Sequence, residues 1–355
     1  MNTALLTVEP LETEAGSKFY KQFFDDLGSD NPYYSLELLK SHEPNQQLLC
    51  FYFSSDDGKK LALMPFHLRK IILHGEDTGY YDMSSPWGYN GPLFEKDIDE
   101  AAQMEFWKTV DQWYRENKVV SEFVRFNLDG NYNHYNGTAL HTLYNVKGNI
   151  TDWDIFWGNL KSKTRNQFRK AEKEGLVFEQ HHLTIPLEKI EHFYQLYIGT
   201  MDRREADTSF YHDLSYLVDF CQNNPEKVAI GLAYRDGVPV SGEFFLLSTN
   251  TMFSYLGGTN AEYFKLRPNE FLKIKAIQWA KEVGLKYYMI GGGRSDGDNL
   301  YLYKKKYFPF DEDIEFYTGR KIVNEAVYSD LIQLNKPNAT PSEIKTGYFP
   351  QYREQ

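Results

Sequence analysis

The spacing of apolar residues over the first 150 positions predicts a mixed α/β domain. Over 98–117 they recur every three or four positions, which is the period of a helix with one buried face, and a shorter helix is predicted over 18–27. Turn residues at 55–58 predict a hairpin, and 79–93 is a long loop rich in Tyr, Gly and Pro. Runs with the apolar character of strands are 47–53, 61–68, 120–127 and 139–146.

A second α/β pattern begins near residue 151. Thr151 and Asp154 form a capping-box pattern, and a helix is predicted from there to Glu174, stopped by Gly175. Strands are then predicted at 176–180, 228–234, 238–247, 251–256, 287–290 and 314–317. Helices are predicted at 187–201, 211–223, 268–283, 299–306 and 324–334.

The two patterns share one order of elements: helix, strand hairpin, glycine-containing loop, helix, strand. This order favours a duplicated α/β fold with mixed sheets flanked by helices, although no residue-level repeat accompanies it. We expect domains over 1–150 and 151–335. The polar, turn-rich tail at 336–355 is expected to be loosely held.

Composition narrows the class of protein. The chain has 355 residues, and its 27 Tyr, 25 Phe and 6 Trp supply enough apolar area to exclude disorder. A net charge of −11, from 39 Lys and Arg against 50 Asp and Glu, argues against a DNA-coating protein. We expect a cytoplasmic protein without a signal peptide, because no basic n-region opens the chain and no run approaches the roughly 20 apolar residues of a membrane span.

Familiar catalytic and metal-binding motifs are missing from the sequence. It contains no P-loop, no GxSxG elbow and no HExxH. Cys50 and Cys221 belong to no CxxC pair, and the side chains of His181 and His182 point to opposite faces of a predicted strand. We therefore predict no metal site and no tightly bound cofactor.

Two segments stand out as candidate binding surfaces. The loop at 84–92 combines glycines, which let backbone approach a ligand, with aromatic stacking surface, although an ordinary Ω-loop is an equal alternative. Its candidate residues are Trp87, Tyr89 and Gly91. The second segment is a basic helix face made by Lys161, Arg165 and Arg169, spaced four residues apart. In an acidic chain it suits an anionic diphosphate or nucleic acid, although a solvated face is normally favoured.

Two further segments connect a strand to a helix. A helix N-terminus that follows a strand binds anions readily, although a plain connection explains the first of these segments equally well. The residues singled out there are Tyr255, Gly257, Gly258 and Arg267. In the other segment, glycines follow a buried strand and are followed in turn by lysines among aromatic residues. One or two of these lysines can simply face water. Its candidates are Gly292, Gly293, Arg294, Tyr303 and Lys304.

Together these segments resemble the Fem-type aminoacyl transferases and their relatives, which have the GNAT (N-acyltransferase) fold. The loop Pro-Trp-Gly-Tyr-Asn-Gly-Pro at 86–92 is similar to a loop of that family's first domain. The basic run at 163–171, the run ending Thr-Met-Asp-Arg at 200–203 and the run Leu-Tyr-Leu-Tyr-Lys at 300–304 resemble family segments in the same order.

The resemblance implies two GNAT-like domains with an anionic acceptor between them. In the best-known members the acceptor is a cell-wall (peptidoglycan) precursor amine and the donor is aminoacyl-tRNA, so a tRNA 3′ end is an implied partner. Others use acyl-CoA to acylate amino sugars. Carried over by motif, Lys304 would stabilise developing negative charge or a donor phosphate, and Arg165 and Arg169 would bind phosphates.

One departure concerns the acyl-CoA donor. CoA-dependent GNAT domains grip pyrophosphate with Arg/Gln-x-x-Gly-x-Gly/Ala, whereas this chain has Arg-Pro-Asn-Glu-Phe-Leu at 267–272. Both glycines are missing and Glu270 adds negative charge. An acyl-CoA-dependent enzyme of surface polysaccharide synthesis and a non-catalytic GNAT-like binding protein therefore stay open as alternatives.

For catalysis we predict direct attack of an amine on the donor carbonyl, since no nucleophile–base pair stands out. Lys304, with Arg294 or a backbone N–H near Gly292, would stabilise the oxyanion. Tyr255 and Tyr303 are candidate positioning or proton-shuttling phenols. Asp82 and Glu243 are weaker candidates for orienting the amine, and a structural role is favoured for both.

Overall fold

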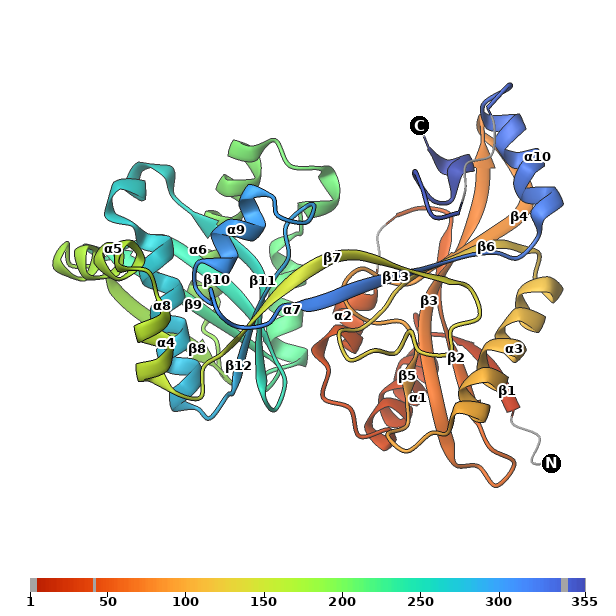
Figure 1. The fold of residues 1–355 in the computed structure, drawn as a ribbon, viewed down its shortest axis with the longest axis horizontal. Helices are drawn as coiled ribbons and strands as arrows, with labels where there is room; N and C mark the ends of the chain where they lie inside the picture. Colours follow the sequence, from red (N-terminus) through yellow and green to blue (C-terminus); the bar gives the residue numbers. More distant parts are fainter. Residues whose placement is uncertain (1–4, 41–42, 340–343, 355) are drawn as a thin grey trace. The chain divides into compact units, whose positions relative to one another are not determined.

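The chain folds into two units, each built on a mixed β-sheet, in a computed structural model that describes residues 5–40, 43–339 and 344–354 (Figure 1). The first unit comprises Met1–Ser29, Tyr33–Thr142 and Glu315–Gln355. The second comprises Asp30–Pro32 and Leu143–Ile314. No helix in the described ranges combines the length and the apolar character needed to cross a bilayer.

The sheet of the first unit contains one parallel pair of strands, β4 with β6, among antiparallel neighbours. Its strands in spatial order are β1 (Leu5–Pro10), β2 (Gln46–Ser54), β3 (Lys60–Leu73), β4 (Glu76–Ser84), β6 (Val119–Arg125) and β13 (Ile314–Ile322), and the short β5 (Leu93–Phe94) pairs with β3. Its helices are α1 (Glu14–Asp26), α2 (Leu36–Leu39), α3 (Glu100–Glu116) and α10 (Glu325–Asn335), with single turns at Pro32–Tyr34 and Gln351–Arg353.

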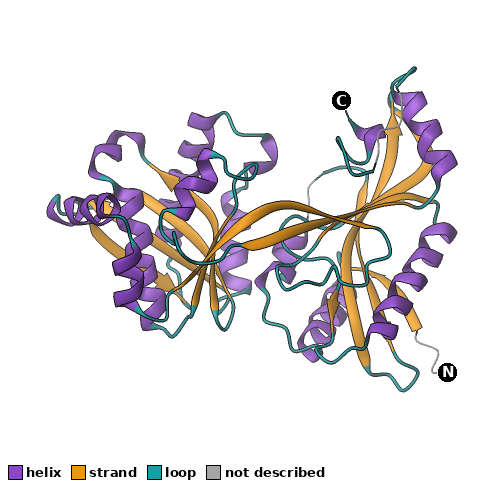
Figure 2. Ribbon diagram, viewed as in Figure 1, coloured by secondary structure: helices purple, strands orange, loops and turns teal. Residues whose placement is uncertain are grey.

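Alternation along β2 explains how this sheet is covered on both faces. Cys50 and Tyr52 lie in a buried cluster with α1 and α2, whereas Phe51 and Phe53 lie in another with α3. Successive side chains of a strand point to opposite faces, so each helix layer receives every second residue. Figure 2 shows helices on the two sides of the strands.

The second unit repeats this plan with β11 and β12 as its parallel pair. Its strands in spatial order are β7 (Thr138–Asn149), β12 (Tyr287–Gly291), β11 (Thr251–Thr259), β10 (Val238–Leu247), β9 (Val228–Arg235) and β8 (Val177–His182). Its helices are α4 (Trp153–Asn159), α5 (Ser162–Lys173), α6 (Leu187–Arg204), α7 (Leu214–Asn223), α8 (Pro268–Glu282) and α9 (Asn299–Lys305), with short 3₁₀ helices at Thr208–Phe210 and Ala261–Leu266.

Both units therefore contain an antiparallel meander, a helix and a parallel strand, in that order along the chain. In the first unit these are β1–β4, α3 and β6, and in the second they are β8–β11, α8 and β12. The agreement confirms the predicted duplication of an α/β fold. In each unit a strand from elsewhere in the chain completes the sheet, β13 beside β6 and β7 beside β12.

The division into units differs from the expected domains at its C-terminal end, because residues 315–355 join the first unit. The cause is long-range: β13 pairs with β6, and its Lys321 contacts Asp111 at 2.7 Å and the buried Glu122 at 3.3 Å. The expectation of a loosely held tail is wrong for residues 344–354. Tyr352 is fully buried, and its hydroxyl hydrogen-bonds with Ser121.

Three local predictions were also wrong. The predicted loop at 79–93 contains the second half of β4, whose polar sequence gives no strand signal, and β1 was missed altogether. The single helix predicted over 154–174 is two helices, because Leu160 and Lys161 adopt extended backbone between α4 and α5.

Candidate active site

The two parallel strands of the second unit separate inside the sheet. β11 and β12 pair over three residues only, ending at Phe253 and Met289, although both strands continue. The neighbouring pairings are irregular at the same place. The register of β10 against β11 shifts between Phe244 and Phe245, and that of β12 against β7 shifts around Ile290. Bulges concentrate next to active sites, and diverging strand edges can offer backbone donors and acceptors to a ligand.

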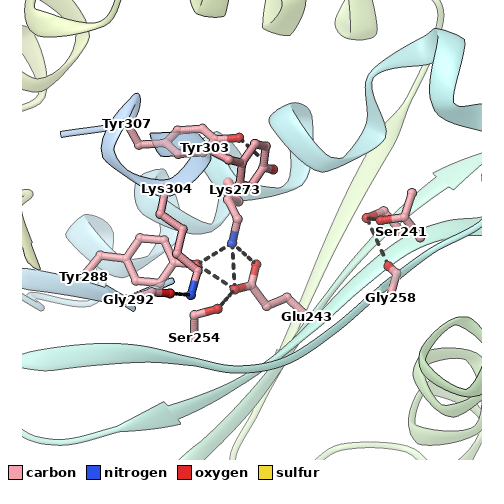
Figure 3. A network of polar contacts seen from close by, with 11 residues as sticks. Ser241, Glu243, Ser254, Gly258, Lys273, Tyr288, Gly292, Tyr303, Lys304 and Tyr307 are labelled. Atoms are coloured by element: carbon pink, nitrogen blue, oxygen red, sulfur yellow. Dashed lines mark hydrogen bonds and ion pairs between the residues drawn. The ribbon is translucent and has the colours of Figure 1, made fainter. Parts of the chain in front are cut away.

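A buried polar network lies beside this divergence (Figure 3). Glu243 of β10 and Lys273 of α8 are 3% and 6% exposed, and the Lys273 ammonium lies 2.9 Å from both carboxylate oxygens. The hydroxyl groups of Tyr288 and Ser254 also donate to Glu243. Because every group has a partner, the network can keep an ion pair in an apolar interior.

Lys304 extends from α9 toward the same network. Its ammonium donates to the carbonyl oxygen of Gly292 at 2.6 Å, just after the end of β12. Burial, then the charge of Lys273, lowers the pKa of Lys304 to about 8, against the raising effect of Glu243 and Asp298. A lysine has three N–H donors, so two more can reach a ligand. Its position suits stabilisation of negative charge that develops beside diverging strands.

Asp298 fixes the start of the helix that carries Lys304. Its carboxylate accepts the backbone N–H of Arg294 at 2.8 Å and of Tyr301 at 2.7 Å, which makes it the N-cap of α9. A Cβ on Gly293 would lie 2.1 Å from this carboxylate, and one on Gly292 would lie 2.4 Å from Leu143. Both glycines therefore permit the close packing that places Lys304.

Aromatic and charged groups also surround the C-terminal half of α9, close to the same network (Figure 3). The Tyr303 hydroxyl lies 3.3 Å from that of Tyr307, and the Lys306 ammonium lies 4.0 Å from the centre of the Tyr303 ring. Lys306 also pairs with Glu270, in the first turn of α8, at 3.0 Å. Burial raises the pKa of Tyr303 well above its ordinary value, so it remains a neutral phenol.

Residues 159–305 match the family model described as an acetyltransferase (GNAT) domain. Among solved structures the chain is similar to FemX, with a TM-score of 0.63, 12% identity and coverage of 87% of this chain and 97% of that one. This similarity decides the fold. The chain has a Fem-type GNAT fold. The result confirms the predicted resemblance and, through the matching domain, the prediction of an acyltransferase.

Two other structures extend the comparison of the GNAT fold. The C-terminal domain of a putative lysylphosphatidylglycerol synthetase from Agrobacterium fabrum has a TM-score of 0.59 and 12% identity, covering 88% of this chain and 93% of that one. A tandem GNAT protein from the clavulanic acid biosynthesis pathway has a TM-score of 0.52 and 10% identity, covering 90% and 98%. No curated protein matches the sequence significantly.

The start of α8 does not fit the pyrophosphate grip of a CoA-dependent GNAT domain. Pro268 opens the helix without an N–H, after Arg267, which is exposed and left-handed with a φ of 61°. The carboxylate of Glu270 is already in the first turn, where the helix dipole favours an anion, and Lys306 neutralises it. Glu270 and Lys306 are thus engaged with each other, whereas the predicted residue Arg267 keeps an exposed side chain at this end of the helix.

The predicted residues of β11 do not all gather at Lys304. The ring of Tyr255 packs on Phe220 and Phe244, and its hydroxyl lies 2.8 Å from that of Tyr216, so it belongs to the α7 side of the sheet. Gly258 lets α6 approach β11, because a Cβ there would lie 2.3 Å from the Leu196 carbonyl.

Gly257 and Arg294 lie where space is open. At Gly257 the nearest atom to an added Cβ would be 3.7 Å away. Arg294 has an exposed side chain in the turn before α9. Both therefore remain candidates for contact with a ligand.

The basic residues near α5 are placed differently from the predicted helix face. The Arg165 guanidinium donates to the carbonyl oxygens of Trp157, Gly158 and Leu160 at 2.6–3.0 Å, and so caps the end of α4. Arg169 lies over the Trp157 ring at 5.6 Å, and Lys161 is the exposed residue between the two helices. Arg165 is thus already occupied by a structural contact.

The predicted loop of the first unit is an ordered turn. Tyr89 packs edge-on against Tyr33 and Phe316, Gly91 has a φ of 70°, and its carbonyl accepts the Tyr34 hydroxyl. Trp87 is 55% exposed, so its indole is the part of this loop that can stack on a ligand.

Sequence reasoning missed Lys273 and gave Glu243 only a minor place. The available signal was a lysine inside the otherwise apolar run Phe-Leu-Lys-Ile-Lys-Ala-Ile at 271–277. A charge on a buried helix face requires a buried partner, and the strand residue Glu243 supplies it.

Proposed function

We propose that this protein transfers an acyl or aminoacyl group to the amine of an anionic acceptor, such as a cell-wall precursor or a nucleotide-sugar-like molecule. The observation that carries the proposal is the half-buried ammonium of Lys304 on the Gly292 carbonyl, beside the diverging strands β11 and β12. The match to a GNAT domain supports it, because that domain includes both strands and Lys304.

The reaction follows from these groups as a direct attack. The neutral amine of the acceptor attacks the donor carbonyl carbon and a tetrahedral oxyanion forms. The oxyanion then collapses to an amide as the bond to the donor's oxygen or sulfur breaks, and the proton lost by the amine passes, directly or through water, to that leaving group. The Lys304 ammonium stabilises the oxyanion or a donor phosphate. A cysteine intermediate is disfavoured in the second unit, since burial raises the pKa of Cys221 to about 12.

For the donor we favour an aminoacyl ester at a tRNA 3′ end over acyl-CoA. The support is the start of α8, where Glu270 and Lys306 are paired and no glycine loop offers N–H groups to a pyrophosphate. Lipid headgroups belong among the acceptors to be tested, because one structural neighbour is named a putative lysylphosphatidylglycerol synthetase.

The experiment measures product by mass spectrometry with aminoacyl-tRNA or acetyl-CoA as donor. Acceptors are UDP-N-acetylmuramoyl pentapeptide and an amino sugar phosphate, which carry amines, and phosphatidylglycerol vesicles, whose nucleophile would be a glycerol hydroxyl and not an amine. Lys304→Met is expected to lower the rate by about 100-fold or more, as removal of an oxyanion donor does. Its circular dichroism spectrum and unfolding midpoint should match those of the unaltered protein.

The matched control is Lys305→Met, one residue along α9. The Lys305 ammonium pairs with Asp313 at 2.9 Å instead of reaching Gly292, so this variant should keep its rate within a few-fold. Full turnover by Lys304→Met would reject the assigned role. Equal loss in both variants would point to damage to α9.

A second candidate function is acyl transfer from acyl-CoA, and the match of residues 159–305 to an acetyltransferase (GNAT) domain favours it. It predicts product with acetyl-CoA as donor. Product with aminoacyl-tRNA and none with acetyl-CoA would exclude it.

A further inference from the structure

A separate charged cluster lies in the first unit around Asp82. Asp82 is fully buried at the end of β4, and it accepts Nε–H groups from Arg69 at 2.7 Å and from Arg353 at 2.5 Å. The Tyr352 hydroxyl donates to it at 3.0 Å. One carboxylate therefore faces two guanidinium groups, which leaves one positive charge uncompensated among the three.

A cavity of about 120 Å³ adjoins these arginines. Its wall is formed by Arg69, Lys70, Ile72 and Arg353 together with residues 43–46. Three of the lining side chains are cationic, and Glu43 is the acidic one. The Arg353 guanidinium also donates to the Lys70 carbonyl at 2.8 Å, so the C-terminal segment forms part of the wall.

Two titratable groups near these arginines are perturbed mainly by burial and then by the charge of Arg69. Burial, then the charge of Arg69, lowers the pKa of Arg125 to about 10. Burial, then Arg69, with a smaller effect of Arg125, lowers the pKa of His67 to about 4, so this histidine is neutral. Its buried Nδ1 has no hydrogen-bond partner in the described part of the chain.

The nearby acidic groups do not cancel these cations. Asp77 lies 3.2 Å from Lys70 and is solvent-accessible, and Asp82 is shared by the two arginines. Counting Arg69, Lys70, Arg125 and Arg353 against Glu43, Asp77 and Asp82 leaves one surplus positive charge.

We propose that the cavity beside Arg69, Lys70 and Arg353 binds a phosphate group. Guanidinium groups present several N–H donors in a fixed fork that matches a tetrahedral oxyanion, and a lysine adds a movable point charge. The volume suits a phosphate and not a whole nucleotide, since pockets for larger organic ligands begin near about 300 Å³. This site is independent of the acyl transfer proposed for the second unit.

The test compares thermal unfolding and calorimetric titration in sodium phosphate and in sodium chloride of equal ionic strength. Phosphate should raise the unfolding midpoint saturably, because it binds the folded state only. Glycerol 3-phosphate, added in a separate titration, distinguishes the source: if it also binds, the site takes the phosphate of a larger molecule, and if it does not, the site takes the free ion.

Two variants change the cavity without removing a partner of the buried Asp82. Lys70→Gln should weaken phosphate binding by about tenfold, the effect of one charge-assisted hydrogen bond. Glu43→Gln should tighten binding, because it removes the acidic group from the wall. Lys59→Gln is the control, since Lys59 pairs with Glu95 elsewhere in the same unit, and its phosphate affinity should be unchanged.

Absence of a saturable phosphate effect beyond that of chloride would overturn the proposal. Binding that survives Lys70→Gln and Glu43→Gln unchanged would overturn it as well, because the phosphate would then lie elsewhere.

Discussion

Lys304 carries its charge where solvation is poor, and this gives its chemistry a pH limit. With a pKa of about 8, the ammonium is lost at a far lower pH than the ordinary 10.5 of lysine. If the ammonium stabilises the transition state, the acyl-transfer rate should fall as pH rises through about 8. Initial rates of the wild type and of Lys304→Met between pH 6.5 and 9.5 test this, because the variant keeps the titration of the acceptor amine and lacks that of Lys304. A ratio of wild-type to variant rate that does not fall across pH 8 would contradict the role.

The lowered pKa of Lys304 also leads to a prediction about the pH dependence of stability. The folded pKa lies below the unfolded one, so between about pH 8 and 10.5 the unfolded chain binds more protons. The burial of this charge therefore opposes folding below pH 8, and the penalty is relieved as pH rises through that window. Urea unfolding should show the wild type gaining free energy of unfolding relative to Lys304→Met from pH 8 to 10.5, whereas a constant difference would contradict the shift.

The Glu243–Lys273 pair should behave as a buried unit. Lys273→Met leaves a carboxylate that is 3% exposed without its cation, which should lower the free energy of unfolding by about 3–5 kcal/mol. Adding Glu243→Gln to that variant should restore part of the loss. Chemical denaturation measures both changes.

An exposed pair of the same chemistry is the control for this prediction. Lys108 and Glu105 on α3 lie 3.0 Å apart at the surface, so Lys108→Met should cost less than about 1 kcal/mol. Equal costs at the buried and the exposed site would show that the buried charge is not what stabilises the network.

At the scale of elements, two neighbouring glycines of β11 have different roles. A Cβ on Gly258 would lie 2.3 Å from the α6 backbone at Leu196, so Gly258→Ala should destabilise the second unit by a few kcal/mol (about 1–3 for overpacking). Gly257→Ala meets nothing closer than 3.7 Å and should leave stability unchanged. Thermal unfolding of the two variants measures this difference. Equal destabilisation by both would contradict the close contact between Gly258 and α6.

The sequence predicted elements well where the signal was local. Strands β9 to β12 and helix α8 lie close to their predicted positions, since apolar runs and turn residues mark them. Gly292, Tyr303 and Lys304 are brought together because a short segment with one N-cap, Asp298, connects them.

Predictions of side-chain placement failed where the placement depends on the face of a strand, on packing between distant segments or on a break in a helix. Tyr255 belongs to the other face of the sheet, because its neighbour Ser254 faces the Glu243 network and successive side chains of a strand point to opposite faces. Lys273 and Glu243 are 30 residues apart in the sequence, so only the packing of α8 on the sheet shows them as a pair. Arg165 was predicted to bind a ligand as part of one continuous helix. The break at Leu160 instead turns its guanidinium to the end of α4.

For the whole molecule, the discontinuous first unit predicts how fragments behave. A fragment of residues 1–150 lacks β13, so β6 loses its antiparallel neighbour and the buried Glu122 loses Lys321. This fragment should be unfolded or molten by circular dichroism and amide NMR. Joining residues 315–355 to it through a flexible linker should restore dispersed spectra, and a well-folded 1–150 fragment would contradict the prediction.

The late position of β13 also sets an order of events during synthesis. A ribosome makes residues 143–314, and hence nearly all of the second unit, before it has made β13, α10 or Tyr352 of the first. Nascent domains generally fold from the N-terminus onward. Here the first unit is completed only after residues 143–314 have been made, so the edge of β6 stays unpaired until residues 315–355 follow. Chaperones would meet the exposed edge in this interval.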